Sequence, residues 1–157
     1  MKQPVTFKPF PNPRVPEPTT PFYHVVPLQI RFNDIDMLGH LNNGVYLTFM
    51  DLGKARYFND VLGYNLNWHE MKAAVVNINV NFYAPTYLDS KISVLTAVTH
   101  ISQHSLKMEQ RIVDVDSGEV KCDAVTIMAG FDVKTATSQP IDPRWREAIE
   151  RWEERRL

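Results

Sequence analysis

Apolar and polar side chains alternate strictly along residues 73–83. The apolar positions are Val76, Ile78, Val80 and Phe82, and the polar positions between them are Asn77, Asn79 and Asn81. Because successive side chains of a strand point to opposite faces, this alternation predicts a β-strand that is covered on one side. Asparagine is disfavoured in strands, so the asparagine face indicates contact with solvent or with a polar surface of another subunit.

Four other segments have the composition of strands: residues 22–33, 88–101, 105–115 and 119–133. Pro27 in the first of them lacks a backbone N–H, which favours an edge strand or a bulge. Asp116, Ser117 and Gly118 separate the last two segments and predict a hairpin turn. The chain after residue 73 is therefore expected to form an antiparallel run of about four strands.

A helix is predicted over residues 43–59, between the first strand and the alternating strand. Asn42 is its predicted N-cap, because the side-chain oxygen can accept a free N–H of the first turn. The apolar residues of this helix are Val45, Tyr46, Leu47, Phe49, Met50, Leu52, Ala55, Tyr57 and Phe58. Since they occupy nearly every side, we expect the helix to be wrapped by other structure rather than laid on a surface.

A short terminal helix is predicted to begin at Pro143, which suits the first helical position. Its apolar stripe consists of Trp145, Ala148, Ile149 and Trp152. Glu147 and Arg151 are four residues apart and are expected to pair on its exposed side.

The predicted order of elements is a strand, one long buried helix and then an antiparallel sheet. An apolar helix followed by such a sheet favours the α+β arrangement called a hotdog fold, in which the sheet curls around a central helix. We expect one domain over residues 22–157, which includes the terminal helix. Residues 1–21 hold seven of the eleven prolines and are expected to form an extended arm. This arm is either a frayed tail or an arm laid across a partner subunit, with Phe7 and Phe10 as anchors.

Charge and cysteine content narrow the possible classes of protein. The net charge of -1 provides no field to attract nucleic acid or an anionic membrane, so we expect neither partner. Cys122 is the single cysteine and lies among small apolar residues, which predicts a buried side chain rather than a nucleophile. No apolar run approaches the roughly 18 residues of a membrane span, and no signal-peptide core is seen. We therefore expect a cytoplasmic protein.

The candidate chemistry lies in the turn before the long helix. The sequence has no phosphate-binding glycine loop and no nucleophile-elbow serine. His100 and His104 flank a strand boundary without further ligands, so no metal site is expected. Asp34 and Asp36, however, precede a helix N-terminus, whose free N–H groups favour an anion or a developing oxyanion. A carboxylate there either caps the helix or attacks an ester-like carbonyl directly or through water.

Two stretches carry a resemblance to a known family. Residues 31–46, RFNDIDMLGHLNNGVY, closely resemble the helix-entry motif of the 4-hydroxybenzoyl-CoA thioesterase-like hotdog family. The helix continuation from Phe49 to Arg56 fits this motif, and residues 81–89, NFYAPTYLD, are similar to the ending of the family's second strand. The resemblance covers roughly residues 22–133.

This resemblance implies an acyl-CoA thioesterase that needs no cofactor and works as a homodimer or homotetramer. By analogy, Asp36 is the catalytic carboxylate and the backbone N–H of Asn43 polarises the thioester carbonyl. His40 is a weaker candidate for the site, and Asp34 is expected to orient the turn. The turn Gly-His-Leu-Asn-Asn belongs to one branch of the family, which leaves the acyl preference open. No lysine or arginine stands out as a partner for the phosphates of coenzyme A.

Other functions stay open at this point. The protein could bind acyl thioesters without turnover, or act on thioesters of acyl carrier protein. A hydro-lyase on the same fold is disfavoured, because such enzymes resemble a motif with a catalytic histidine on the helix.

Overall fold

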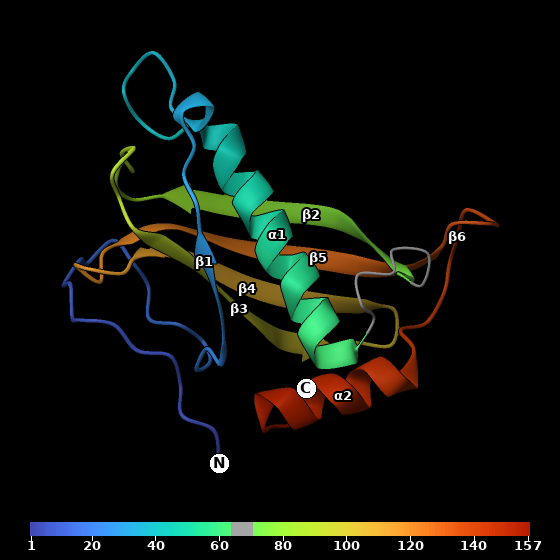
Figure 1. Ribbon diagram of the computed structural model, residues 1–157. Helices are drawn as coiled ribbons and strands as arrows, with labels where there is room; N and C mark the ends of the chain where they lie inside the picture. The colour runs from blue at the N-terminus through green and yellow to red at the C-terminus, as the bar shows by residue number, and fades with distance from the viewer. Residues whose placement is uncertain (64–70) are drawn as a thin grey trace.

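The computed structural model describes residues 1–63 and 71–157 (Figure 1). In chain order the described elements are β1 (His24–Leu28), the 3-10 helix η1 (Phe32–Asp34), α1 (Asn43–Leu62), β2 (Ala73–Phe82), β3 (Ile92–Ile101), β4 (Ser105–Asp114), β5 (Val120–Asp132), β6 (Thr137–Ser138) and α2 (Pro143–Glu153). The predicted helices and the predicted strands after residue 73 are confirmed, with bounds that differ by a few residues. The first strand is shorter than predicted, because the chain leaves β1 after Leu28 and forms η1.

The strands form one antiparallel sheet in the order β1-β3-β4-β5-β2, with β6 added to β5. β1 lies at one edge, as Pro27 predicted. β2 lies at the other edge and pairs only with β5, so its outer side has no strand neighbour among the described residues. The second edge is long, and its side chains Val75, Val76 and Ile78 are exposed.

A β-bulge at Val76 changes the face pattern predicted for β2. The register shifts between Val75 and Asn77, and beyond the shift Ile78 and Val80 lie opposite Thr126 and Ala124 of β5. The side chain of Val76 lies within this irregularity and is 62% exposed. The prediction that Val76 lies on the same face as Ile78 and Val80 is therefore wrong, because a bulge breaks the two-residue period. Ile78 and Phe82 are also exposed, by 40% and 41%, so the covered face predicted for this strand is only partly covered within the single chain.

Helix α1 crosses one face of the sheet diagonally (Figure 1). Its buried residues are Tyr46, Phe49, Met50, Gly53, Lys54, Tyr57 and Phe58. On the opposite side Leu47 and Leu52 are exposed by 38% and 41%. The expectation that the helix is wrapped on all sides is therefore wrong for the single chain, whose sheet covers one side of the helix only.

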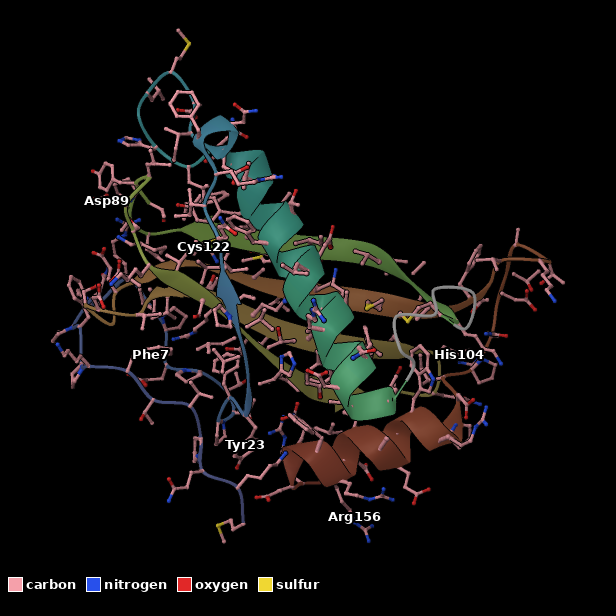
Figure 2. The ribbon with its side chains drawn as sticks, viewed as in Figure 1. Phe7, Tyr23, Asp89, His104, Cys122 and Arg156 are labelled. Carbon is pink, nitrogen blue, oxygen red and sulfur yellow. The ribbon has the colours of Figure 1, made fainter. Side chains whose placement is uncertain are left out.

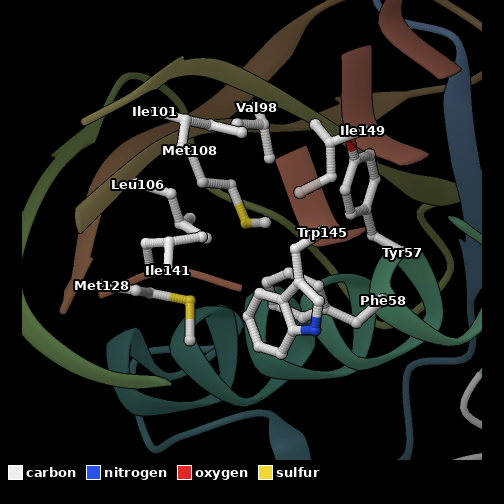
Figure 3. Packing of buried hydrophobic residues seen from close by; sticks show 10 residues of the cluster. All are labelled: Tyr57, Phe58, Val98, Ile101, Leu106, Met108, Met128, Ile141, Trp145 and Ile149. Atoms are coloured by element: carbon white, nitrogen blue, oxygen red, sulfur yellow. The ribbon is translucent and has the colours of Figure 1, made fainter. Parts of the chain in front are cut away.

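Two apolar clusters fix the position of α1 on the sheet. The larger joins the C-terminal part of α1 to α2 and to the sheet, and Figure 3 shows Phe58 beside Trp145 and Tyr57 near Ile149. The second lies under the N-terminal half, where Tyr46, Phe49 and Met50 pack on inward-facing residues of β3, β4 and β5. The second cluster holds the start of the helix in place, and the candidate residues lie at that start.

Helix α2 closes one end of this core. The side chain of Asp142 accepts a hydrogen bond from the backbone N–H of Arg144, and Pro143 is the first helical residue. Trp145 and Ile149 are buried, while Arg151 pairs with Glu147 at 2.8 Å on the exposed side. The predicted start, apolar stripe and ion pair of this helix are confirmed.

The N-terminal arm lies on the sheet of its own chain, on the face opposite α1. Val5 and Phe7 pack with Phe22 against Leu95, Ala97 and Val113, which alternate along β3 and β4 with the residues that face α1. The backbone N–H of Val5 donates to the carbonyl of Phe22 at 2.8 Å. The prediction of a frayed tail is therefore wrong, whereas a contact of the arm with a partner subunit stays a prediction. Phe7 is half-buried and Phe10 is exposed.

Within residues 1–63 and 71–157, neither helix combines the length and the apolar character that crossing a lipid bilayer requires.

Candidate active site

Asp34 is built into the turn that leads to α1. Its carboxylate is buried and accepts hydrogen bonds from the backbone N–H of Arg31 at 2.8 Å and from the Arg31 guanidinium at 3.2 Å. Its carbonyl accepts the N–H of Asn42 at 2.9 Å. These donors, above all the backbone N–H of Arg31, hold the pKa of the Asp34 carboxyl below its usual value. All the contacts of Asp34 serve the shape of the turn.

Asp36 lies at the start of a tighter turn and is half-buried. Its backbone N–H donates to the carbonyl of His40 at 2.9 Å, and its carbonyl accepts the N–H of Gly39 at 3.0 Å. Gly39 has a φ of 80°, which favours glycine at this position. One carboxylate oxygen of Asp36 accepts the N–H of Leu38 at 2.9 Å, while the other has no hydrogen-bond donor among the described residues. Asp36 thus keeps one oxygen available for chemistry.

The N-terminus of α1 presents a free backbone donor. Asn42 is the N-cap, as predicted, and its side-chain oxygen accepts the N–H of Gly44 at 2.9 Å. The N–H of Val45 donates to the carbonyl of Asn42. The N–H of Asn43, the first helical residue, has no acceptor in the part of the chain that the structure describes. A helix start with one unsatisfied N–H is suited to an anionic oxygen.

A cavity of 250 Å³ opens beside this helix start. It is lined by His40, Leu41, Asn43, Tyr46, Phe82, Tyr83, Ala84 and Pro85. Asn43 and His40 therefore meet at one cavity, whereas Asp34 and Asp36 do not line it. Asp36 is tied to the cavity wall through its backbone hydrogen bond to His40.

The segment after β2 completes the cavity through contacts that sequence reasoning did not single out. The Tyr46 hydroxyl donates to the hydroxyl of Thr86 at 2.8 Å, and the N–H of Leu41 donates to the carbonyl of Thr86 at 2.8 Å. The ring of His40 meets the edge of Tyr87 at a centroid distance of 5.4 Å. The only sequence signal for these partners was that both stretches match the same family pattern.

The remaining reactive side chains lie outside this site. Cys122 is fully buried in β5 below α1 (Figure 2), and burial raises the pKa of its thiol to about 12. The prediction of a buried cysteine is confirmed. His100 and His104 are exposed, and within the described residues no group of three or more His, Cys, Asp or Glu side chains could hold a metal ion.

The arrangement combines three features that acyl transfer needs. A carboxylate with a free oxygen can act as a nucleophile or a general base, and an unsatisfied N–H at a helix start can stabilise an oxyanion. A cavity lined in part by Leu41, Tyr46 and Phe82 can hold an acyl group.

Comparisons with known proteins agree with this chemistry. The chain is 26% identical over 126 residues to the long-chain acyl-CoA thioesterase FadM of Escherichia coli strain K12, covering 78% of this chain and 94% of FadM. Among solved structures, a thioesterase from Thermus thermophilus complexed with coenzyme A and Zn superposes with a TM-score of 0.75 at 26% identity, covering 87% and 98% of the two chains. A 1,4-dihydroxy-2-naphthoyl-CoA thioesterase from Synechocystis superposes with a TM-score of 0.70 at 17% identity, covering 80% and 94%.

These neighbours confirm the predicted α+β hotdog fold. The model of the family described as the thioesterase-like superfamily matches residues 30–149, which include the turn, α1 and the whole sheet except β1. The chain belongs to the thioesterase-like superfamily.

Proposed function

We propose that this protein hydrolyses acyl-CoA thioesters to the free acid and coenzyme A, with Asp36 as the catalytic carboxylate. The observation that carries this proposal is the free N–H of Asn43 on the wall of a cavity with mixed polar and apolar lining, beside the turn that holds Asp36. Membership of the thioesterase-like superfamily and the similarity to FadM support the same reaction.

In the proposed reaction the thioester carbonyl lies at the start of α1, between the cavity and the turn that holds Asp36, with its oxygen directed at the N–H of Asn43. Either Asp36 removes a proton from a water that attacks the carbonyl carbon, or its free oxygen attacks the carbon directly. In both routes the oxygen becomes negatively charged beside the helix N-terminus, and the C–S bond then breaks to release the thiolate of coenzyme A. In the direct route, water subsequently hydrolyses the acyl-aspartyl anhydride.

Labelled oxygen in the enzyme would identify the direct route. In a single turnover in ¹⁸O water, direct attack followed by hydrolysis at the Asp36 carboxyl places the label in the enzyme. The general-base route places the label only in the acid product, as does hydrolysis of the anhydride at its acyl carbon. Mass spectrometry of the peptide that contains Asp36 measures the difference.

His40 and Asp34 have supporting roles in this proposal. The carbonyl of His40 fixes the backbone of Asp36, and its ring lines the cavity against Tyr87. Asp34 orients the turn through its contacts with Arg31. Neither side chain is required to change its protonation state during the reaction.

The proposed assembly is a homodimer or homotetramer that pairs through the open edge of β2. An exposed strand edge is a template for another strand, and this edge carries exposed Val76 and Ile78. Leu47 and Leu52 on the uncovered side of α1 would be covered by a second subunit. We also infer a cytoplasmic location, because CoA thioesters are intracellular substrates and the one cysteine forms no intrachain disulfide.

The experiment that tests the function is a hydrolysis screen over short, long and aromatic acyl-CoA thioesters, with detection of the released thiol. Hydrolysis of at least one class supports the proposal. Binding of acyl-CoA without release of thiol would contradict it, and turnover of acyl carrier protein thioesters alone would replace coenzyme A as the substrate carrier.

A further inference from the structure

Coenzyme A carries phosphate groups at the far end of its pantetheine chain, and the proposed reaction leaves them without a protein partner. The inference below rests on the proposed function, because it concerns how the same site holds this part of the substrate. Phosphate groups are bound best by guanidinium groups, which donate several hydrogen bonds from one plane. Their binding requires a cation near the cavity that is not already held in an ion pair.

Two cations near the cavity already have partners. The ammonium group of Lys121 is buried, donates to the carbonyl of Pro85 at 3.0 Å and pairs with Glu119. The guanidinium of Arg31 pairs with the buried carboxylate of Asp34. Recruiting either group for a phosphate would break contacts that shape the cavity wall or the turn.

Arg14 of the N-terminal arm is free of such partners. Its guanidinium donates to the carbonyl of Phe82 at 3.4 Å and lies 5.9 Å from the ring centroid of Tyr83. Both Phe82 and Tyr83 line the cavity at the start of α1. Arg14 is exposed, and no carboxylate of the described residues forms an ion pair with it. Arg14 is therefore an exposed cation that contacts two residues of the cavity wall and has further N–H donors without a partner among the described residues.

The local sequence explains why Arg14 is presented in this way. The N–H of Val15 donates to the carbonyl of Asn12 at 3.0 Å, and the N–H of Arg14 donates to the side chain of Asn12 at 3.0 Å. Pro13 stands at the second position of this turn, where its fixed φ is favourable, and Asn12 stands at the first. The turn is therefore preorganised, and Arg14 lies at its third position.

The turn is also anchored to the sheet. The guanidinium of Arg111 is largely buried and donates to the carbonyl of Pro16, directly after the turn. Further along the arm, the hydroxyl of Thr19 donates to the carboxylate of Glu109. Before the turn, the arm runs so close to the β4–β5 hairpin that a Cβ at Gly118 would collide with the carbonyl oxygen of Lys8. The arm is thus held on both sides of Arg14.

We propose that the N-terminal arm supplies a substrate contact, in which the Arg14 guanidinium binds a phosphate of coenzyme A at the rim of the cavity. The contact selects thioesters that carry phosphates and leaves the reacting atoms untouched. It therefore acts on substrate binding and not on the chemical step.

The test compares an acyl-CoA with the corresponding S-acyl-pantetheine, which lacks all phosphates. Arg14→Gln is expected to raise KM for the acyl-CoA about five- to twentyfold, which is the usual effect of losing one partly exposed charge-assisted hydrogen bond. The value of kcat should not change. KM for S-acyl-pantetheine should stay the same. Arg156→Gln is the matched control, since Arg156 is an exposed arginine near α2, away from the arm's Phe7 (Figure 2), and it should alter neither KM.

The same variants separate this proposal from the proposed function. If Arg14→Gln changes KM for both thioesters equally, or for neither, the phosphate contact is wrong even though the enzyme is a thioesterase. If the unaltered protein hydrolyses neither thioester, the proposed function fails, and calorimetric titration with free coenzyme A and with pantetheine then decides the role of Arg14. Weaker binding of coenzyme A alone by Arg14→Gln would uphold the contact, and equal binding by both proteins would overturn it.

Discussion

The carboxylate of Asp34 accepts hydrogen bonds from both the backbone N–H and the guanidinium of Arg31, at 2.8 and 3.2 Å. This pair closes the turn before α1 and leaves Asp34 buried. In Asp36, two residues later, only one carboxylate oxygen accepts a backbone hydrogen bond, from the N–H of Leu38. The two aspartates of the turn therefore have roles that mutation can separate.

Asp34→Asn is expected to lower stability rather than to abolish chemistry. The amide retains one acceptor oxygen but loses the charge that Arg31 faces, so the variant should lose about 1–2 kcal/mol of unfolding free energy. Urea unfolding measures this loss. An unchanged urea midpoint would show that the contacts with Arg31 do not hold the turn.

The contribution of Asp34 to stability should depend on pH. Because the folded-state pKa of Asp34 is below its ordinary value of 3.8, the unfolded chain binds the proton more readily. The stabilisation is thus complete above the ordinary pKa and is lost as pH falls through the folded-state pKa. The difference in stability between the unaltered protein and Asp34→Asn should be constant near neutral pH and should shrink below about pH 4. A difference that grows on acidification would contradict this assignment.

Asn43→Pro isolates the backbone donor from the carboxylate. Proline is tolerated at the first helical position, so the variant should fold while lacking the free N–H of Asn43. We expect kcat to fall about 10²–10³-fold, the usual effect of losing one oxyanion donor, with a smaller change in KM.

Asn43→Ala is the matched control for that variant, because it removes the side chain and keeps the N–H. It should remain far more active than Asn43→Pro. Asn42 already has the extended backbone that a following proline requires, with φ of −64° and ψ of 140°. Equal activity of the two folded variants would show that this N–H does not stabilise the oxyanion.

The open edge of β2 is the proposed site of pairing between subunits, and charged residues placed on it should weaken that pairing. Charges on an edge strand oppose pairing, so the double variant Val76→Lys, Ile78→Lys should shift the protein from an oligomer towards a monomer and lower its activity. Light scattering coupled to size-exclusion chromatography measures the mass. Val133→Lys, at an apolar residue that is also exposed but lies outside β2, is the control and should leave the mass unchanged. An unaltered protein that is a fully active monomer would contradict the proposed pairing.

Local chemistry made the start of α1 predictable from sequence. Asn42 caps the helix because its side chain reaches an N–H two residues away, a relationship that needs no knowledge of the fold. Pro27 likewise predicted an edge strand, since its missing N–H acts wherever the strand pairs. The placement of Asn43 at the first helical position followed from the same cap.

Features that depend on distant partners were not predictable. The bulge at Val76 arises where β2 pairs with β5. It was not predictable because the sequence of β2 alternates like that of a regular strand. The exposed side of α1, with Leu47 and Leu52, has the composition of a buried surface. The position of Arg14 depends on the docking of the arm onto Arg111, nearly a hundred residues later in the chain. Composition showed the arm to be extended but did not show where it lies.

The catalytic role of Asp36 is tested by the rate of thiol release from an acyl-CoA by the unaltered protein, by Asp36→Asn and by Asp34→Asn. Asparagine at position 36 can still accept the N–H of Leu38, so the turn should persist and the melting temperature should hardly change or should rise. We predict that Asp36→Asn lowers kcat about 10²–10⁴-fold, and further if Asp36 is the nucleophile, while folded Asp34→Asn retains most of its activity. Abolished thiol release in Asp34→Asn together with unimpaired release in Asp36→Asn would show that Asp36 is not the catalytic carboxylate.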